Sequence, residues 1–276
     1  MEGMLGDFKE VDGIFYPSSK ISEKASLSYP SDGLDRLILI EDSSYWFWHR
    51  NQCIEYFVKK YCSETIFLDV GGGNGPVTKH LQNGGMEAIL IEPDNSGCQN
   101  AKSRGVEKIF SGELEDISFT NRSQPISIGM FDVIEHIDDD KKVVLDVHKK
   151  LKEGEYFVLT VPSIRLLWSE ADVHAGHYRR YTKKMIKKLL QNSGFEIVEC
   201  HFLFSSLIMP IFFFRVMPSL AGFYKVNGVT NSREHGSKEG LFSRTLRKLL
   251  GREFSRIKKG RSRSYGSSLL VVARKI

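Results

Sequence analysis

The sequence predicts an α/β fold, a doubly wound sheet of seven strands that is mostly parallel and has an antiparallel last strand. Short apolar runs alternate with helical patterns from residue 65 onward, and a glycine-rich turn follows the first run. Strands that alternate with helices are typical of a parallel sheet covered by helices on both faces. With 276 residues, 41% of them hydrophobic and 26% charged, the composition excludes wholesale disorder, collagen-like repeats and a multispan membrane protein.

The elements follow in order along the chain. Residues 1–33 are polar and rich in Ser, Gly and Pro, and residues 44–62 carry apolar side chains at helical spacing. Strands are predicted at residues 65–70, 87–91, 106–110, 126–130, 156–161, 195–200 and 269–273. Helices are predicted at residues 76–83, 95–104, 138–151 and 183–192, the last with Thr182 as its N-cap and Gly194 after its end.

These elements divide the chain into four expected segments. They are an N-terminal arm (residues 1–43), a cofactor-binding core (44–204), an apolar and basic insertion or lid (205–265) and the last strand of the core sheet (266–276). Residues 202–224 are strongly apolar, but the run is short for a bilayer span of about 20 residues. Packing into the core, closure over an acceptor pocket and contact with a membrane surface all fit it.

The net charge of +5 is unevenly distributed. Residues 233–276 hold 13 Lys and Arg against 3 Asp and Glu, whereas the rest of the chain is acidic overall. A basic segment of this kind can meet nucleic acid or an anionic membrane surface, or it can be a solvated helical face. We expect no specific nucleic-acid partner, and peripheral contact with an anionic membrane stays open.

The cysteines and the N-terminus bear on location. Cys53, Cys62, Cys98 and Cys200 form no CxxC pair and no metal-ligand spacing, which favours a reduced chain without a structural metal over a disulfide framework. Residues 1–17 contain acids and lack the apolar run of a secretory signal. The sequence therefore predicts a cytoplasmic protein.

The turn after the first predicted strand indicates a ligand site. It reads Asp69-Val-Gly71-Gly-Gly73-Asn-Gly75, and it opens the helix at residues 76–83. Glycines let the backbone approach a ligand closely, and a helix N-terminus presents free N–H groups. Glu92 ends the next predicted strand, where a carboxylate is placed to accept both hydroxyls of a ribose. The combination predicts a cofactor that contains adenosine.

Two residues favour one class of adenosine cofactor. A dinucleotide fingerprint has Gly or Ala where this chain has Pro76. Asp69, two residues before the first glycine, suits a cationic or amino-bearing ligand better than a pyrophosphate. An NAD(P)-binding oxidoreductase is nevertheless an alternative, and so is a non-catalytic, membrane-associated binding protein.

Four motifs carry a family resemblance. They are HRN at residues 49–51, DVGGGNG at 69–75, FDVIEHI at 131–137 and GHYRRYT at 176–182, and a YP-SDG turn at 29–33 precedes them. With these motifs the chain resembles the class I S-adenosylmethionine (SAM) methyltransferases, in particular a bacterial group similar to the ubiquinone-biosynthesis O-methyltransferases. The resemblance implies SAM as cofactor and in-line O-methylation of a small or lipid-linked acceptor.

The resemblance also implies a role for each residue that binds the cofactor. Asp69 would lie below the methionine amino group, with Gly71, Gly73 and Gly75 forming the loop along the methionine part. Glu92 would take the ribose hydroxyls, while Glu113 and Leu114 would meet the adenine. The residues that would border the sulfonium are Met130, Phe131 and Asp132.

The acceptor side is predicted from residue chemistry. His177 is the candidate general base because imidazole titrates near neutral pH, and the competing histidines are His49, His136 and His174. Arg179, Arg180 and Tyr181 could clamp a carboxylate or phosphate on the acceptor, since guanidinium groups match those anions. Alternatively, these side chains pair with the acidic stretch at residues 138–140.

Overall fold

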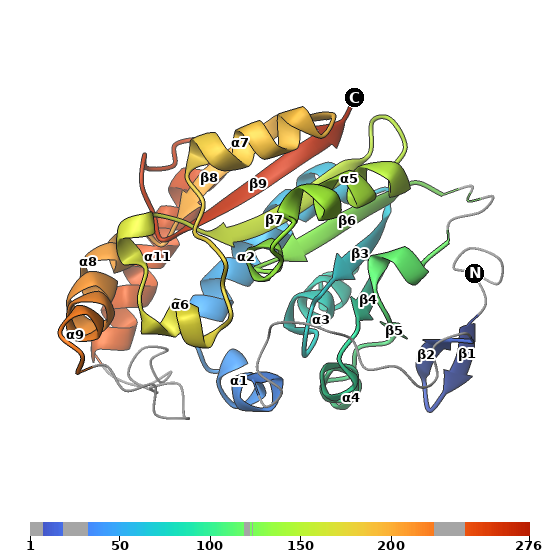
Figure 1. The fold of residues 1–276 in the computed structure, drawn as a ribbon, viewed down its shortest axis with the longest axis horizontal. Coiled ribbons are helices and arrows are strands. Elements are labelled where there is room, and N and C mark those ends of the chain that lie inside the picture. The colour runs from blue at the N-terminus through green and yellow to red at the C-terminus, as the bar shows by residue number, and fades with distance from the viewer. Residues whose placement is uncertain (1–7, 19–32, 119–121, 123, 224–240) are drawn as a thin grey trace.

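A single mixed sheet forms the centre of the molecule in the computed structural model, which describes residues 8–18, 33–118, 122, 124–223 and 241–276 (Figure 1). Over these residues the strand order is β1-β2-β5-β4-β3-β6-β7-β9-β8. The strands are β1 (Phe8–Val11), β2 (Ile14–Pro17), β3 (Ile66–Val70), β4 (Ala88–Glu92), β5 (Ile109–Ser111), β6 (Ile126–Phe131), β7 (Tyr156–Pro162), β8 (Phe195–Leu203) and β9 (Ser268–Lys275).

The sheet has nine strands in the described residues, so the prediction of seven was wrong. The additional strands β1 and β2 form a hairpin in the expected N-terminal arm, and β2 pairs in parallel with β5 at the sheet edge. The aromatic rings of Phe8 and Phe15 lie 5.2 and 4.7 Å from the ring of Phe110 on β5. Each of these strands has only four residues and lies in a polar segment of the sequence, so neither could be predicted without the edge of the sheet that the hairpin extends.

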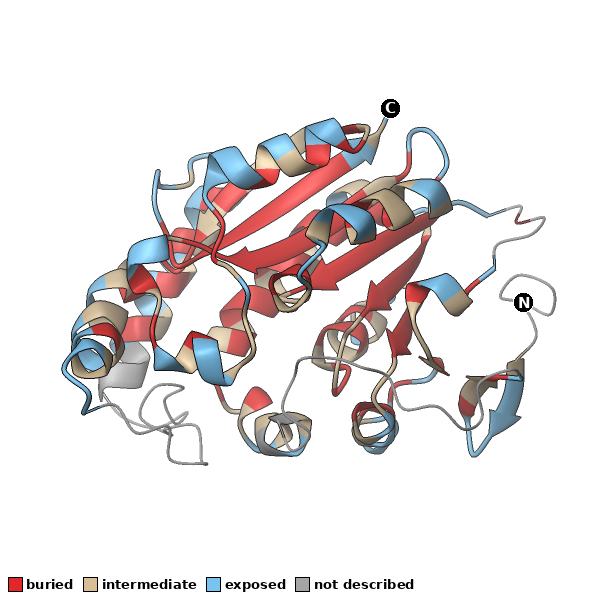
Figure 2. Cartoon of the chain, viewed as in Figure 1, coloured by how far each residue is buried: buried red, intermediate tan, exposed pale blue. Residues whose placement is uncertain are grey.

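The central strands β5, β4, β3, β6 and β7 are parallel, as predicted. Strand β9 lies between β7 and β8 and is antiparallel to both, which confirms the predicted antiparallel last strand. Residues of β3, β4 and β6 are buried throughout, and Figure 2 shows the middle of the sheet as a buried layer. This burial on both faces is the reason why these strands read as continuous apolar runs.

Helices cover both faces of the sheet (Figure 1). Several helices match their predicted ranges closely, among them the helix at residues 183–192. Thr182 caps this helix, as predicted, by accepting a hydrogen bond from the Met185 N–H at 3.1 Å. The α-helices are α1 (Gly33–Glu41), α2 (Tyr45–Cys62), α3 (Pro76–Asn83), α4 (Asn95–Ser103), α5 (Asp140–Lys150), α6 (Glu170–His174), α7 (Lys183–Asn192), α8 (Ile208–Ile211), α9 (Met217–Leu220) and α11 (Leu241–Lys258).

Most of the described part of the segment between β8 and β9 is helical. Helix α8, a π-helical turn η5 (Phe212–Val216) and α9 follow one another, and α11 leads back to β9. Residues 29–32 of the YP-SDG turn and residues 224–240 of the apolar and basic segment lie outside the described residues. Among the helices that the structure describes, none combines the length and apolar character that crossing a membrane requires.

A buried carboxylate fixes α11 to the core. Glu253 accepts hydrogen bonds from the N–H groups of Phe204 and Ser205 at 2.8 and 2.9 Å, and its Oε2 lies 2.9 Å from the His49 Nε2 of α2. Leu246 and Leu250 of α11 pack in the same apolar cluster as Ile54 and Phe57 of α2. Helix α11 is therefore an integral part of the domain rather than a loose tail.

Candidate functional site

The glycine loop after β3 has the backbone that its sequence requires. Gly71, Gly73 and Gly75 have φ of 70°, 55° and 68°, in the left-handed region that favours glycine. At Gly72 the constraint is space, because a Cβ there would lie 2.6 Å from Leu90 Cδ1 and 2.7 Å from Asp69 Oδ2. The loop opens α3 with Pro76 in its first turn, which suits proline because its missing N–H would be unsatisfied there anyway.

The carboxylate of Asp69 is fully buried beneath this loop. Its Oδ2 accepts a hydrogen bond from the Thr78 hydroxyl at 2.6 Å, whereas no described residue donates to Oδ1. Burial raises the pKa of Asp69 to about 6. A buried carboxylate oxygen without a donor fits a ligand that brings an amino group or a positive charge.

Glu92 joins the ends of two neighbouring strands. It ends β4, its Oε2 accepts from the Gly73 N–H and its Oε1 from the Asp94 N–H, both at 2.8 Å. The residue is almost fully buried, and burial raises its pKa to about 7. A Cβ at Gly97 of α4 would lie 3.0 Å from Glu92 Cγ, so the space beside this carboxyl depends on the glycine.

The predicted adenine-binding residues follow β5. Glu113 precedes the short helix η1 (Leu114–Asp116), and its N–H donates to Asp116 Oδ2 at 2.9 Å. Leu114 is buried in the core cluster that also contains Phe110 and Met130. Both residues therefore lie in the loop after β5, which is the neighbour of β4 in the sheet.

Arg50, to which the sequence assigned no role, reaches the site at the end of β6. Met130 and Phe131 are buried, and Asp132 has a φ of 59°, in the left-handed region. Arg50 of α2 donates from Nη1 to Asp132 Oδ2 at 2.5 Å. Its guanidinium also lies 4.8 Å from the ring centroid of Trp46, within cation–π range. The HRN motif was the only sequence signal for this contact.

A second buried carboxylate with oxygens that lack a donor lies beyond the end of β6. Glu135 is fully buried, no described residue donates to either of its oxygens, and burial raises its pKa well above the ordinary value. The ring of His136 lies 4.7 Å from the ring of His177, nearly perpendicular to it. Burial lowers the pKa of His136 to about 4. Glu135, His136 and His177 each place one donor atom within 4.8 Å of the others, close enough for one metal ion to bridge.

Asp172 holds the candidate base His177. Its Oδ1 lies 2.9 Å from His177 Nδ1, and both of its oxygens accept hydrogen bonds from Arg180, at 2.7 and 3.0 Å. With these donors around it, the pKa of Asp172 is lowered to about 2 despite its burial. When Nδ1 donates to this carboxylate, the other ring nitrogen of His177 is left as an acceptor. No pattern in the sequence singles out Asp172.

The three residues predicted to clamp an acceptor have partners within the chain. Arg179 pairs with Asp138 at 3.2 Å and with Asp140 at 2.9 Å, which is the acidic stretch named as the alternative. Arg180 is buried against Asp172, and the hydroxyl of the buried Tyr181 donates to Asp140 Oδ2 at 2.7 Å. Contact of these side chains with an acceptor stays a prediction.

Two competing histidines lie elsewhere. His49 is fully buried and pairs with Glu253 where α2 meets α11. His174 is exposed at the end of α6. Of the histidines named from the sequence, His136 and His177 are thus the two whose rings meet beyond the ends of β6 and β7.

Comparisons with known proteins agree with this arrangement. A family model described as "Methyltransferase domain" matches residues 39–200. A Mycolicibacterium smegmatis protein described as a probable S-adenosylmethionine-dependent methyltransferase is 22% identical over 162 residues, which are 57% of this chain and 62% of that protein. The chain therefore spans less than two thirds of that relative's length.

Solved methyltransferase structures have a similar fold. A SAM-dependent methyltransferase of Thermotoga maritima is 18% identical with a TM-score of 0.51, over 90% of this chain and 100% of that chain. Phosphoethanolamine N-methyltransferase 2 of Haemonchus contortus, in complex with SAM, is 16% identical with a TM-score of 0.54, over 90% of this chain and 58% of that one. At these identities the likeness concerns the fold alone.

Proposed function

Since the chain belongs to the methyltransferase domain family and its cofactor is SAM, we propose that it catalyses O-methylation of a small or lipid-linked acceptor. When bound, SAM supplies a methyl group that is already activated on a sulfonium. The protein must then hold the acceptor oxygen in line with that methyl group, exclude water and accept a proton. The residues described above support two parts of this reaction, which are binding of the cofactor and acceptance of the proton.

The cofactor would lie along the carboxyl ends of β3, β4, β5 and β6. Asp69 supports this placement because its donor-free Oδ1 suits the methionine amino group, and the loop of Gly71, Gly73 and Gly75 would run beside it. Glu92 would accept the ribose hydroxyls at the end of β4. The remaining contacts would be made by Glu113 and Leu114 to the adenine and by Met130, Phe131 and Asp132 around the sulfonium.

The pairing of Asp172 with His177 is the observation that carries the O-methylation proposal. A hydroxyl acceptor must lose its proton as the new carbon–oxygen bond forms, so a fixed base is needed near neutral pH. Asp172 fixes the His177 ring through Nδ1, and Arg180 holds Asp172 from the other side. This arrangement leaves the second nitrogen of His177 to accept the acceptor's proton, so Arg180 and Asp172 act as positioning residues.

The class of acceptor is inferred from the family resemblance and from the basic residues near the base. The similarity to the ubiquinone-biosynthesis group favours an aromatic hydroxyl, with or without an isoprenoid tail. Release of Arg179 from both Asp138 and Asp140 would free its guanidinium for an anionic group on such an acceptor.

Binding and product analysis test the proposal together. We expect calorimetry to detect binding of SAM and S-adenosylhomocysteine but not of NAD. With SAM and a panel of hydroxylated aromatic compounds, with and without isoprenoid tails, mass spectrometry should find the new methyl group on oxygen. Tighter binding of NAD than of SAM would contradict the cofactor site. A methyl group found on nitrogen or carbon would contradict O-methylation alone.

Cofactor binding should release protons below neutral pH. Burial raises the pKa of Asp69 to about 6 and that of Glu92 to about 7 in the free protein, so both carboxyls are partly protonated near pH 6. The positive charge of SAM favours their ionised forms. We therefore expect SAM affinity to fall as the pH is lowered through these values, and calorimetry in buffers of different ionisation enthalpy to detect proton release.

The matched control for this linkage is the double variant Asp69→Asn/Glu92→Gln, which keeps the shape of both side chains but cannot ionise. Proton release should disappear in it. Equal release in both proteins would assign the titration to other groups.

A further inference from the structure

A stripe of large apolar side chains is exposed on the helices that follow β8. In a compact soluble domain, contiguous exposed apolar surface of this kind marks an interaction site. The exposed fractions range from 47% for Met217 to 83% for Phe223. The members of this apolar stripe are Met209, Phe213, Phe214, Met217, Leu220 and Phe223.

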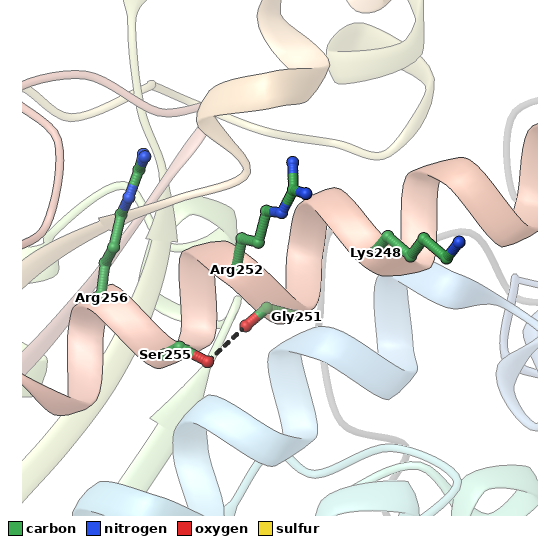
Figure 3. A pocket seen from close by; sticks show the side chains of 5 residues that line it. All are labelled: Lys248, Gly251, Arg252, Ser255 and Arg256. Atoms are coloured by element: carbon green, nitrogen blue, oxygen red, sulfur yellow. Dashed lines mark hydrogen bonds between the residues drawn. The ribbon is translucent and has the colours of Figure 1, made fainter.

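A row of cations lies on the neighbouring helix α11. Lys248, Arg252 and Arg256 are spaced by four residues, so they share one helix face, and all three are exposed. They line an open hollow of about 430 Å³, and Figure 3 shows Arg252 and Arg256 pointing away from the adjacent helix α2. Within the described part of the chain, no carboxylate forms an ion pair with any member of this basic row.

The stripe and the row belong to one end of the molecule. Figure 1 shows α8, α9 and α11 together at that end. Leu207 and Ile211, at the base of the apolar helices, pack in the same cluster as Leu246 and Leu250 of α11. The inner face of α11 is thus occupied by the core, and its basic row is left to the outside.

We propose that this end of the protein binds the surface of an anionic lipid membrane. Apolar side chains that enter the boundary between headgroups and acyl chains, flanked by cations that meet anionic headgroups, are the two parts of a peripheral membrane site. Charge argues against a second copy of this chain as the occupant. In a symmetric dimer across the stripe each copy would present the same apolar stripe and the same basic row, so the partner would offer no anionic surface of this face to the cations.

The membrane surface would lie near the candidate base. The Glu170 N–H at the start of α6 donates to the Ser219 hydroxyl of α9 at 3.0 Å. Helix α6 also carries Asp172, which holds His177. The docking surface does not depend on the proposed reaction, because membrane binding is measured without cofactor or acceptor.

Vesicle co-sedimentation of the full chain tests this inference. We expect binding to vesicles of phosphatidylcholine and phosphatidylglycerol at low salt, weak binding to phosphatidylcholine alone, and release at high salt. The triple variant Lys248→Gln/Arg252→Gln/Arg256→Gln should lower the partition coefficient about 100-fold, at about fivefold per charge. The double variant Phe214→Ser/Phe223→Ser should lower it about tenfold or more through lost apolar burial.

Matched controls separate this surface from general charge and hydrophobicity. The variant Lys141→Gln/Lys184→Gln/Lys188→Gln removes three exposed charges on α5 and α7, and Val11→Ser/Ile276→Ser removes two exposed apolar side chains elsewhere. We expect the apolar control to bind as the wild type does and the charge control to bind far more tightly than the α11 variant. No binding to either vesicle at low salt would overturn the inference, as would equal losses in the two charge variants. Self-association that is abolished by Phe214→Ser/Phe223→Ser, without vesicle binding, would assign the stripe to a dimer instead.

Discussion

Replacing His177 by alanine is expected to lower turnover by about 10²–10⁴-fold, the usual contribution of a positioned base, and to leave SAM affinity unchanged. Asp172 fixes this imidazole at 2.9 Å, and the residues that would hold the cofactor lie on other loops. Turnover is measured as S-adenosylhomocysteine formation over a range of pH, and affinity by calorimetry. Loss of the base should also remove the acidic limb of the pH–rate profile.

The control for this variant is His174→Ala, which removes an exposed histidine three residues away. It should retain full turnover. Asp172→Asn should also lower turnover. Its thermal unfolding must be measured as well, because the same change weakens the ion pair with Arg180. If His177→Ala kept its pH–rate profile, His177 would be structural. If dialysis against EDTA abolished wild-type activity, the cluster with Glu135 and His136 would hold a metal instead.

The second large effect is expected for Asp69→Ala and Glu92→Ala, each of which should weaken SAM binding by about 1–3 kcal/mol. That range corresponds to about 5- to 150-fold in the dissociation constant. Asp69 Oδ1 has no donor in the described residues, and Glu92 holds the Gly73 N–H of the loop, so both changes remove groups that we propose to contact the cofactor. Calorimetry with SAM measures the effect directly.

Stability distinguishes lost binding from lost folding in these variants. Burial raises the pKa of both carboxyls, so removing either one relieves a desolvation cost, and thermal unfolding of the cofactor-free protein should change little for Asp69→Ala. Glu196→Ala, which removes a half-exposed acid on β8, is the matched control and should bind SAM normally. Normal affinity in both site variants would mean that the cofactor binds elsewhere.

Local sequence patterns predicted much of the core. The apolar runs at β3, β4, β6 and β7 are buried on both faces of a parallel sheet. Such strands can be predicted from their own residues, without knowledge of the strands they pair with. The glycine loop could be predicted because the left-handed φ values at Gly71, Gly73 and Gly75 are ones that glycine adopts most readily. Glu92 was readable because it ends its strand.

Other features depended on partners far away in the chain. The four-residue strands β1 and β2 form because β2 pairs with the edge strand β5, which lies more than 90 residues further along the chain. Asp132 meets Arg50 across 82 residues, and neither residue type indicates the other. The same holds for His49, which the sequence left as a competing candidate base and which the fold places beside Glu253, 204 residues away.

The sequence by itself therefore determined where the central strands of the core and the glycine loop lie along the chain, because each follows from periodicity, backbone preference or a residue's place at a strand end. Only the tertiary structure decided which histidine a buried carboxylate holds, which guanidinium groups are paired, and that an apolar stripe lies exposed beside a basic row. Burial and long-range pairing set the protonation and orientation of a side chain, and both arise only when distant segments pack together.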